Sequence, residues 1–142
     1  ERTNHHKIPL NILKERLFSE QKERVEVNVD LNTDIDTVLR NCDYYESRIR
    51  QHELVGKQYY YFFGLYLSQL KHLYSIDNYS LRDINIWIEE RYHIKISTIN
   101  KYIRFAELCD NYPWLLNSKL VYNEIMNNIP EITRIISEHT PQ

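Results

Sequence analysis

The chain has 142 residues, a formal net charge of -2, a 42% hydrophobic content, and only 2 Gly and 4 Pro. Length and apolar content fit one domain, residues 1–142, and the scarcity of Gly and Pro favours helices over a turn-rich β fold. The net charge excludes a protein that binds nucleic acid by bulk positive charge alone. We therefore expect an all-α domain of six or seven helices.

The N-terminal region combines a polar start, a helix and an alternating segment. Residues 1–7 are polar, and we expect them to be frayed. Pro9 suits a first helical turn, and leucines at helical spacing after it predict a helix from about Pro9 to Arg24. Alternation in Val25–Val29 places three valines on one face of an extended segment. That segment is either an edge strand that pairs with another subunit or, as we favour, a connector against the helices.

A helical apolar rhythm runs through residues 33–74. Thr33 can cap its start, with Asp34 and Asp36 near the positive end of the helix dipole. Apolar residues then recur at alternating three- and four-residue steps, as in a heptad pattern. Gly56 is the expected break, with one long helix as the alternative. Two helices are therefore predicted, at about Thr33–Glu53 and Val55–Tyr74.

The second of these helices is apolar almost all round. A helix without a polar face is usually central in its domain or covered by a partner. Gly64 would let a neighbouring helix approach closely, because it carries no Cβ.

Residues 79–109 read as helix, turn and helix. Ser80 can cap a helix that runs to about Arg91, with Asp83 at its third position as in a capping box. Glu89, Glu90 and Arg91 look solvated, and Tyr92–Ile96 is the turn. The buried stripe of this first helix is expected to be Leu81, Ile84, Trp87 and Ile88.

Ser97 is expected to cap the second helix of this pair, on which Ile99, Ile103 and Ala106 face inward. Phe105 and Leu108 lie off that stripe. They either pack against Trp114 or form a surface for a partner.

The C-terminal region, residues 113–139, is also expected to be helical. Trp114, Leu115 and Leu116 are apolar enough to dock onto the core. Two short helices are predicted after them, at about Ser118–Asn127 and Pro130–His139.

The helix pair in residues 79–109 has the shape of a helix-turn-helix, whose second helix enters a DNA major groove. Its outward face is rich in short polar and basic side chains, which can contact phosphates and base edges. The expected DNA-contacting residues are Lys95, Ser97, Thr98, Asn100, Lys101 and Arg104.

Charge within the helix pair is balanced. The bases between residues 79 and 110 are Arg82, Arg91, Lys95, Lys101 and Arg104, and the acids are Asp83, Glu89, Glu90, Glu107 and Asp110. A DNA reader usually has a basic excess. The competing interpretation is therefore a protein-interaction or scaffold module in which the helix pair serves packing alone.

Three blocks resemble a bacterial and phage helix-turn-helix family of poorly known function. They are Gly64-x-x-Leu67-x-x-Leu70-Lys71, Trp87-Ile88-Glu89-Glu90 and Ser97-Thr98-x-x-Lys101-Tyr102-Ile103-Arg104-Phe105-Ala106-Glu107. Ile99, Lys101 and Ile103 stand where the family has a small residue, an arginine and a methionine. The resemblance covers Gly64–Glu107 and implies the fold of the helix pair more strongly than its function.

A weaker resemblance, of composition and of the helical pair, is to the homeobox-like accessory subunits of the ciliate DNA adenine-N6 methyltransferase complex. It implies a subunit that helps an enzymatic partner, a DNA methyltransferase, to engage duplex DNA without itself methylating. It also implies an intracellular location, in the nucleus if the source is eukaryotic.

The sequence offers little that catalysis could use. It has no P-loop, no dinucleotide fingerprint, no G-x-S-x-G elbow, no D-P-P-W type motif, and no metal-ligand spacing of His, Cys, Asp and Glu. Cys42 and Cys109 fall on apolar stripes, so we expect buried free thiols in an intracellular protein. The apolar run Tyr59–Leu67 is too short to span a bilayer. We expect no enzyme activity, cofactor, small-molecule substrate or membrane partner, and a protein partner in addition to DNA.

Overall fold

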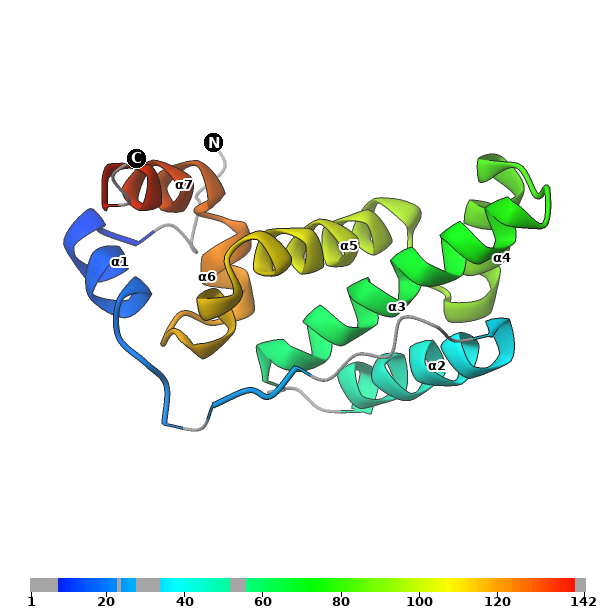
Figure 1. Cartoon of the computed structure of the whole chain (residues 1–142), viewed down its shortest axis with the longest axis horizontal. Helices are drawn as coiled ribbons and strands as arrows, with labels where there is room; N and C mark the ends of the chain where they lie inside the picture. The colour runs from blue at the N-terminus through cyan, green and yellow to red at the C-terminus, as the bar shows by residue number, and fades with distance from the viewer. Residues whose placement is uncertain (1–7, 23, 28–33, 52–55, 140–142) are drawn as a thin grey trace. The chain divides into compact units, whose positions relative to one another are not determined.

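The structure, a computed structural model, describes residues 8–22, 24–27, 34–51 and 56–139. Over these residues it is all-α, with seven α-helices, one 3₁₀ helix and no strand, as predicted (Figure 1). The elements are α1 (Leu10–Leu17), α2 (Ile35–Gln51), α3 (Lys57–Ile76), α4 (Leu81–Tyr92), α5 (Ile96–Asn111), η1 (Pro113–Asn117), α6 (Tyr122–Met126) and α7 (Ile129–His139). The predictions made for residues 1–7, Val29, Thr33, Glu53 and Val55 fall outside the described residues.

The chain groups into two compact units. Residues 27–111 contain α2 to α5, and residues 1–26 with 112–142 contain α1, η1, α6 and α7. The helix α1 therefore belongs with the C-terminal helices, although the sequence places it next to α2. That residues 1–142 act as one domain stays a prediction.

In the unit of residues 27–111, α3 lies between α2 and α5 (Figure 1). Its apolar residues point in several directions, because α2, α4 and α5 all pack against it. The core of this unit joins residues from all four helices: Val38, Cys42, Phe63, Tyr66, Leu67, Leu70, Ile84, Ile88, Tyr92 and Ile99. The central position predicted for this apolar helix is thereby confirmed.

Gly64 brings the backbones of α3 and α5 together, as its sequence position suggested. A Cβ atom at residue 64 would overlap the carbonyl group of Tyr102 and lie 3.1 Å from the backbone nitrogen of Ile103. Aromatic rings flank the contact, with the ring centroids of Phe63 and Tyr102 5.5 Å apart and those of Tyr60 and Tyr102 5.7 Å apart. Only glycine permits this approach without displacing α5.

The break at Gly56 is confirmed, because α2 and α3 are separate helices and Gly56 is the extended N-cap of α3. At the start of α2 the capping side chain is that of Asp34, whose Oδ1 accepts the Thr37 N–H at 2.9 Å. Hydrogen bonding to Thr37, through its side chain first and its backbone N–H second, lowers the pKa of the Asp34 carboxyl.

Cys42 and Cys109 are buried free thiols, as predicted. Burial raises the pKa of each thiol to about 12, so both stay protonated at neutral pH.

The cap of α4 is confirmed, since Ser80 Oγ accepts the Asp83 N–H at 3.1 Å. Its predicted buried stripe is correct for Ile84 and Ile88 but wrong for Leu81, which is 63% exposed. Periodicity identifies the inward face of a helix, but it does not say how far along that face a neighbouring helix extends.

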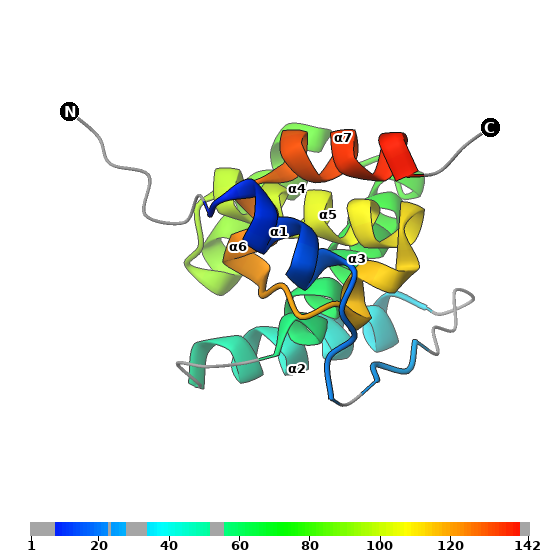
Figure 2. The same ribbon diagram turned by 90° about the vertical axis from the view of Figure 1, so that its left-hand side faces the viewer.

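In the second unit, α1 is shorter than predicted and ends at Leu17. Beyond it the chain pairs with the segment after η1: Glu20 forms an isolated antiparallel bridge with Ser118, and the Lys119 N–H bonds to the Arg16 carbonyl at 3.1 Å. These non-local bonds replace the helical bonds that the predicted extension would have made. The helices α1 and α7 lie side by side (Figure 2).

The segment after α1 is an extended connector where it is described. Residues 24–27 join no strand, and the Val25 N–H bonds to Oδ1 of Asn117 at 2.6 Å. This agrees with the favoured interpretation of the valine alternation for the residues that the structure describes.

The two predicted C-terminal helices are present as α6 and α7, although their bounds differ from the predicted ones. The first begins at Tyr122, after an extended stretch, while Pro113 opens η1. Leu115 and Leu116 are buried, and Trp114 stacks on Phe18 with ring centroids 6.0 Å apart.

Gly64→Ala should lower the free energy of unfolding by about 1–3 kcal/mol, because the added Cβ overlaps the α5 backbone. Helix propensity alone predicts the opposite sign, since alanine is favoured over glycine by about 1 kcal/mol in a helix interior. Urea unfolding followed by circular dichroism distinguishes the two.

Gly56→Ala is the matched control for this substitution. Its Cβ would meet only the flexible side chain of Gln58, and its φ of -60° suits alanine. We expect a change within about 0.5 kcal/mol. A Gly64→Ala variant as stable as the parent would contradict the close-contact account.

Candidate nucleic-acid interface

A three-residue turn joins α4 to α5. His93 adopts the left-handed conformation, with φ 56° and ψ 39°, and its N–H bonds to the Glu89 carbonyl at 2.8 Å. The Lys95 carbonyl then accepts the N–H groups of Thr98 and Ile99. The helix α5 therefore begins at Ile96, and the prediction that Ser97 caps it is wrong, because the left-handed residue turns the chain earlier.

Glu89 connects the two helices of the pair. Its Oε2 accepts the Ile96 N–H at 2.6 Å, so the expectation that Glu89 is simply solvated is wrong. A carboxylate at the N-terminus of α5 is favourable, because it lies at the positive end of the helix dipole. It also occupies one N–H group, that of Ile96, which could otherwise meet a phosphate.

The inward face of α5 is wider than predicted. Ile99 and Ala106 are buried and Ile103 is half-buried, which agrees with the prediction that these residues face inward. Phe105, predicted to lie off the stripe, is fully buried. The buried side of α5 therefore includes Phe105 in addition to the predicted stripe.

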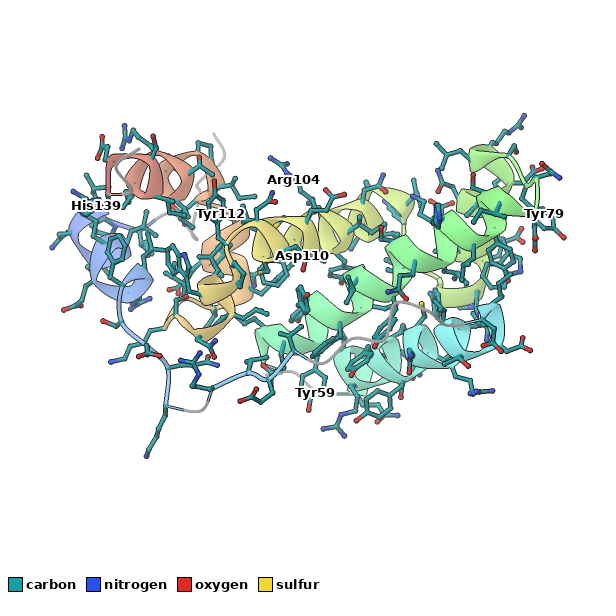
Figure 3. All side chains as sticks on the ribbon, in the orientation of Figure 1. Tyr59, Tyr79, Arg104, Asp110, Tyr112 and His139 are labelled. Atoms are coloured by element: carbon teal, nitrogen blue, oxygen red, sulfur yellow. The ribbon has the colours of Figure 1, made fainter. Side chains whose placement is uncertain are left out.

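The outward face of α5 carries most of the predicted DNA-contacting residues. Lys95, Ser97, Asn100, Lys101 and Arg104 are exposed, and Thr98 is half-buried. Steps of three and four residues place the exposed members of α5 on one side of the helix. Figure 3 shows the Arg104 side chain directed away from α3 and Asp110 on the side of α5 that faces α3.

Lys71 on α3 is a member of this surface that sequence reasoning did not assign. Its Nζ donates to Oδ1 of Asn100 at 3.4 Å, and partial burial lowers its pKa. The motif block that contains Lys71 was the available signal, but only the packing of α3 on α5 brings this amine to Asn100.

The acids of the helix pair are not spread evenly over its surface. Glu89 is bonded to the Ile96 N–H, and Oδ1 of Asp110 accepts the Tyr61 hydroxyl at 2.6 Å. Asp83 and Glu90 line a hollow beside α4. Of the five acids of this pair, all within the described part of the chain, Glu107 is the one that shares the exposed side of α5 with the basic residues.

The bases are distributed differently. Arg91 is paired with Asp43 of α2 at 2.6 Å, whereas Lys101 and Arg104 form no ion pair within the described part of the chain. The outward face of α5 is therefore locally basic, although the helix pair as a whole is neutral.

Asp43 holds α4 against α2. Its carboxylate accepts the Arg91 Nε–H at 3.0 Å and the Arg91 Nη2–H at 2.6 Å, and Oδ1 also accepts the Tyr92 hydroxyl at 2.8 Å. Partial burial raises the pKa of Asp43, but the hydrogen bonds from Arg91 and Tyr92 outweigh it, so the pKa lies below the usual 3.8. For Tyr92, burial and then the nearby negative groups raise the pKa.

No protein-family model, curated protein or solved structure matches this chain. Both resemblances drawn from its motifs and composition therefore stay predictions. Residues 8–22, 24–27, 34–51 and 56–139 contain no group of three or more His, Cys, Asp or Glu placed to hold a metal ion. None of the helices in these ranges has both the length and the apolar character needed to cross a membrane.

Asp43→Asn should lower the free energy of unfolding by about 1 kcal/mol at neutral pH. The effect is small because the ion pair with Arg91 is partly exposed and solvent screens it. The folded-state pKa is depressed, so the contribution of Asp43 is present above pH 3.8 and is lost as pH falls through the folded pKa. Urea unfolding of parent and variant should therefore give curves that converge in acid.

Asp77→Asn is the control, since Asp77 is exposed in the loop after α3. A gap between the parent and Asp43→Asn that is independent of pH would contradict the ionic role of Asp43.

Proposed function

We propose that this chain is a non-catalytic subunit of a larger nucleic-acid-modifying assembly and contacts duplex DNA with the outward face of α5. The single observation that supports this most is the placement of Lys101 and Arg104. Both are exposed on the second helix of a helix-turn-helix pair, and neither forms an ion pair among the described residues. That is the face which such a motif presents to the major groove.

The chemistry of this face suits both positioning and limited reading of bases. Lys101 neutralises phosphate as a point charge, while Arg104 can also pair with guanine through two parallel hydrogen bonds. Ser97 can donate to phosphate oxygens. Asn100 can pair with adenine, and its Oδ1 also accepts a hydrogen bond from Lys71.

Two basic residues contribute little electrostatic free energy to DNA binding, so the proposal includes a partner protein. Two phosphate contacts give a salt slope of about -1.8, or roughly a tenfold loss of affinity between about 50 and 200 mM salt. So small a basic face binds weakly alone. A DNA-modifying enzyme as partner would supply the remaining affinity and the chemistry.

A second candidate function is a protein-interaction module without DNA contact. It is favoured by the exposed apolar side chains gathered between residues 76 and 86, namely Ile76, Tyr79, Leu81 and Ile86. Exposed apolar residues grouped in this way are typical of docking surfaces.

Replacing both Lys101 and Arg104 with alanine should weaken duplex binding and reduce the magnitude of the salt slope by about 1.8, which corresponds to two lost phosphate contacts. Fluorescence anisotropy with a labelled duplex at several salt concentrations measures both quantities. The charge-matched control is Lys119→Ala with Arg134→Ala, two exposed bases of the other unit. Unchanged binding in the Lys101 and Arg104 variant, or no binding by the parent at low salt, would support the interaction-module function instead.

Glu107→Gln should change DNA affinity in the opposite direction. The carboxylate lies one turn after Arg104 on the exposed side of α5, where it repels phosphate. Its removal should tighten binding by about two- to fivefold at low salt, and this gain should vanish at high salt. An affinity equal to that of the parent at low salt would contradict contact by this face.

A further inference from the structure

A hollow of about 460 Å³ opens beside α4, at the corner where α3 ends and α4 begins. Three aromatic residues, Tyr74, Tyr79 and Trp87, line it together with Ile86 and the carboxylates of Asp83 and Glu90. We call it the α4 hollow. Its volume lies within the range of small-molecule and side-chain pockets.

The aromatic walls meet at steep angles. The rings of Tyr74 and Tyr79 are 5.6 Å apart at 86°, and those of Tyr74 and Trp87 are 5.3 Å apart at 65°. Because the rings are not parallel, their π faces point in different directions and do not form one stack. Because a π face is negative, such walls attract a cation.

The backbone holds Tyr79 in this position although the residue is 55% exposed. Asn78 adopts the left-handed conformation, with φ 71°, and donates its N–H to the Ser75 carbonyl, while the Tyr79 N–H bonds to the Tyr74 carbonyl. This is a Schellman motif, whose usual apolar contact is here the contact of Tyr79 with Tyr74. Figure 3 shows Tyr79 at the end of the helix pair where α3 leads into α4.

The charges of the hollow are all negative. Asp83 and Glu90 line it, no Lys or Arg does, and neither carboxylate forms an ion pair within the described residues. The Arg91 guanidinium lies 5.4 Å from the centre of the Trp87 ring, but its charge is balanced by Asp43. An occupant that complements the hollow is therefore a cation with a flat or apolar body.

We propose that the α4 hollow binds an arginine side chain from a basic segment of a partner protein. A guanidinium stacks on aromatic faces and pairs with carboxylates through two hydrogen bonds, which a lysine ammonium does not do. DNA is not the occupant, since Asp83 and Glu90 repel phosphate. The proposal does not depend on DNA contact by α5, because it uses other residues.

The test is a titration of the full ¹⁵N-labelled chain with a blocked pentapeptide of sequence Gly-Arg-Gly-Arg-Gly, followed by heteronuclear NMR. The chain has 2 Trp, so the spectrum contains two indole N–H signals, and Trp114 serves as an internal control. The Trp87 signal should move and saturate while that of Trp114 stays in place. A peptide with neutral citrulline at both arginine positions should leave both signals unchanged, and a lysine peptide should bind several-fold more weakly.

Substitutions then assign the binding to the hollow. Tyr79→Leu keeps apolar bulk against Tyr74 but removes the π face, and should weaken peptide binding about fivefold, whereas Tyr79→Phe should bind like the parent. Glu90→Gln should weaken it about threefold, and Glu107→Gln, the same charge change on α5, should not. Equal binding of the citrulline peptide, or a Trp87 signal that does not move, overturns the proposal on the parent chain alone; equal binding of the lysine peptide overturns the choice of arginine.

Discussion

The contact of α3 with α5 at Gly64 determines how the helix pair can be used. At this point two backbones approach with no side chain between them, and the rings of Phe63 and Tyr60 lie beside Tyr102. A contact of this kind fixes the rotation of α5 about its own axis, because any other rotation would place a side chain against the α3 backbone. The exposed positions of Lys101 and Arg104 follow from that rotation. The proposed DNA-contacting face is thus set by a residue with no side chain, on a different helix.

The charged residues of this helix pair balance in number but not in their distribution over its surface. The count of bases and acids is balanced, yet Glu89 and Asp110 are bonded to a backbone N–H and a tyrosine hydroxyl, and Arg91 is paired with Asp43. What remains is a basic side of α5, an acidic hollow beside α4, and the exposed Arg82 of α4. A net charge near zero can therefore accompany two surfaces of opposite sign, each suited to a different class of partner.

Local patterns predicted much of the fold. The helical period gave α2 to α5, Gly56 the break between α2 and α3, and Ser80 the start of α4, because each depends on residues within one or two turns. Non-local contacts account for the errors. The end of α1 depends on pairing with residues 117–119, and the role of Glu89 depends on a turn that brings its carboxylate to Ile96. The six proposed DNA-contacting residues could be selected from the sequence, whereas Lys71 could not, because its place depends on helix packing.

The two thiols allow local opening of the interior of the unit of residues 27–111 to be measured. Cys42 and Cys109 are buried on α2 and α5, the helices on either side of α3, and neither is ionised at neutral pH. A thiol in that state reacts with an alkylating reagent only after the surrounding helices separate. Labelling of each cysteine would then report a local opening free energy, one for the α2 side and one for the α5 side. The native chain thus already contains two internal probes of which side of the bundle separates first.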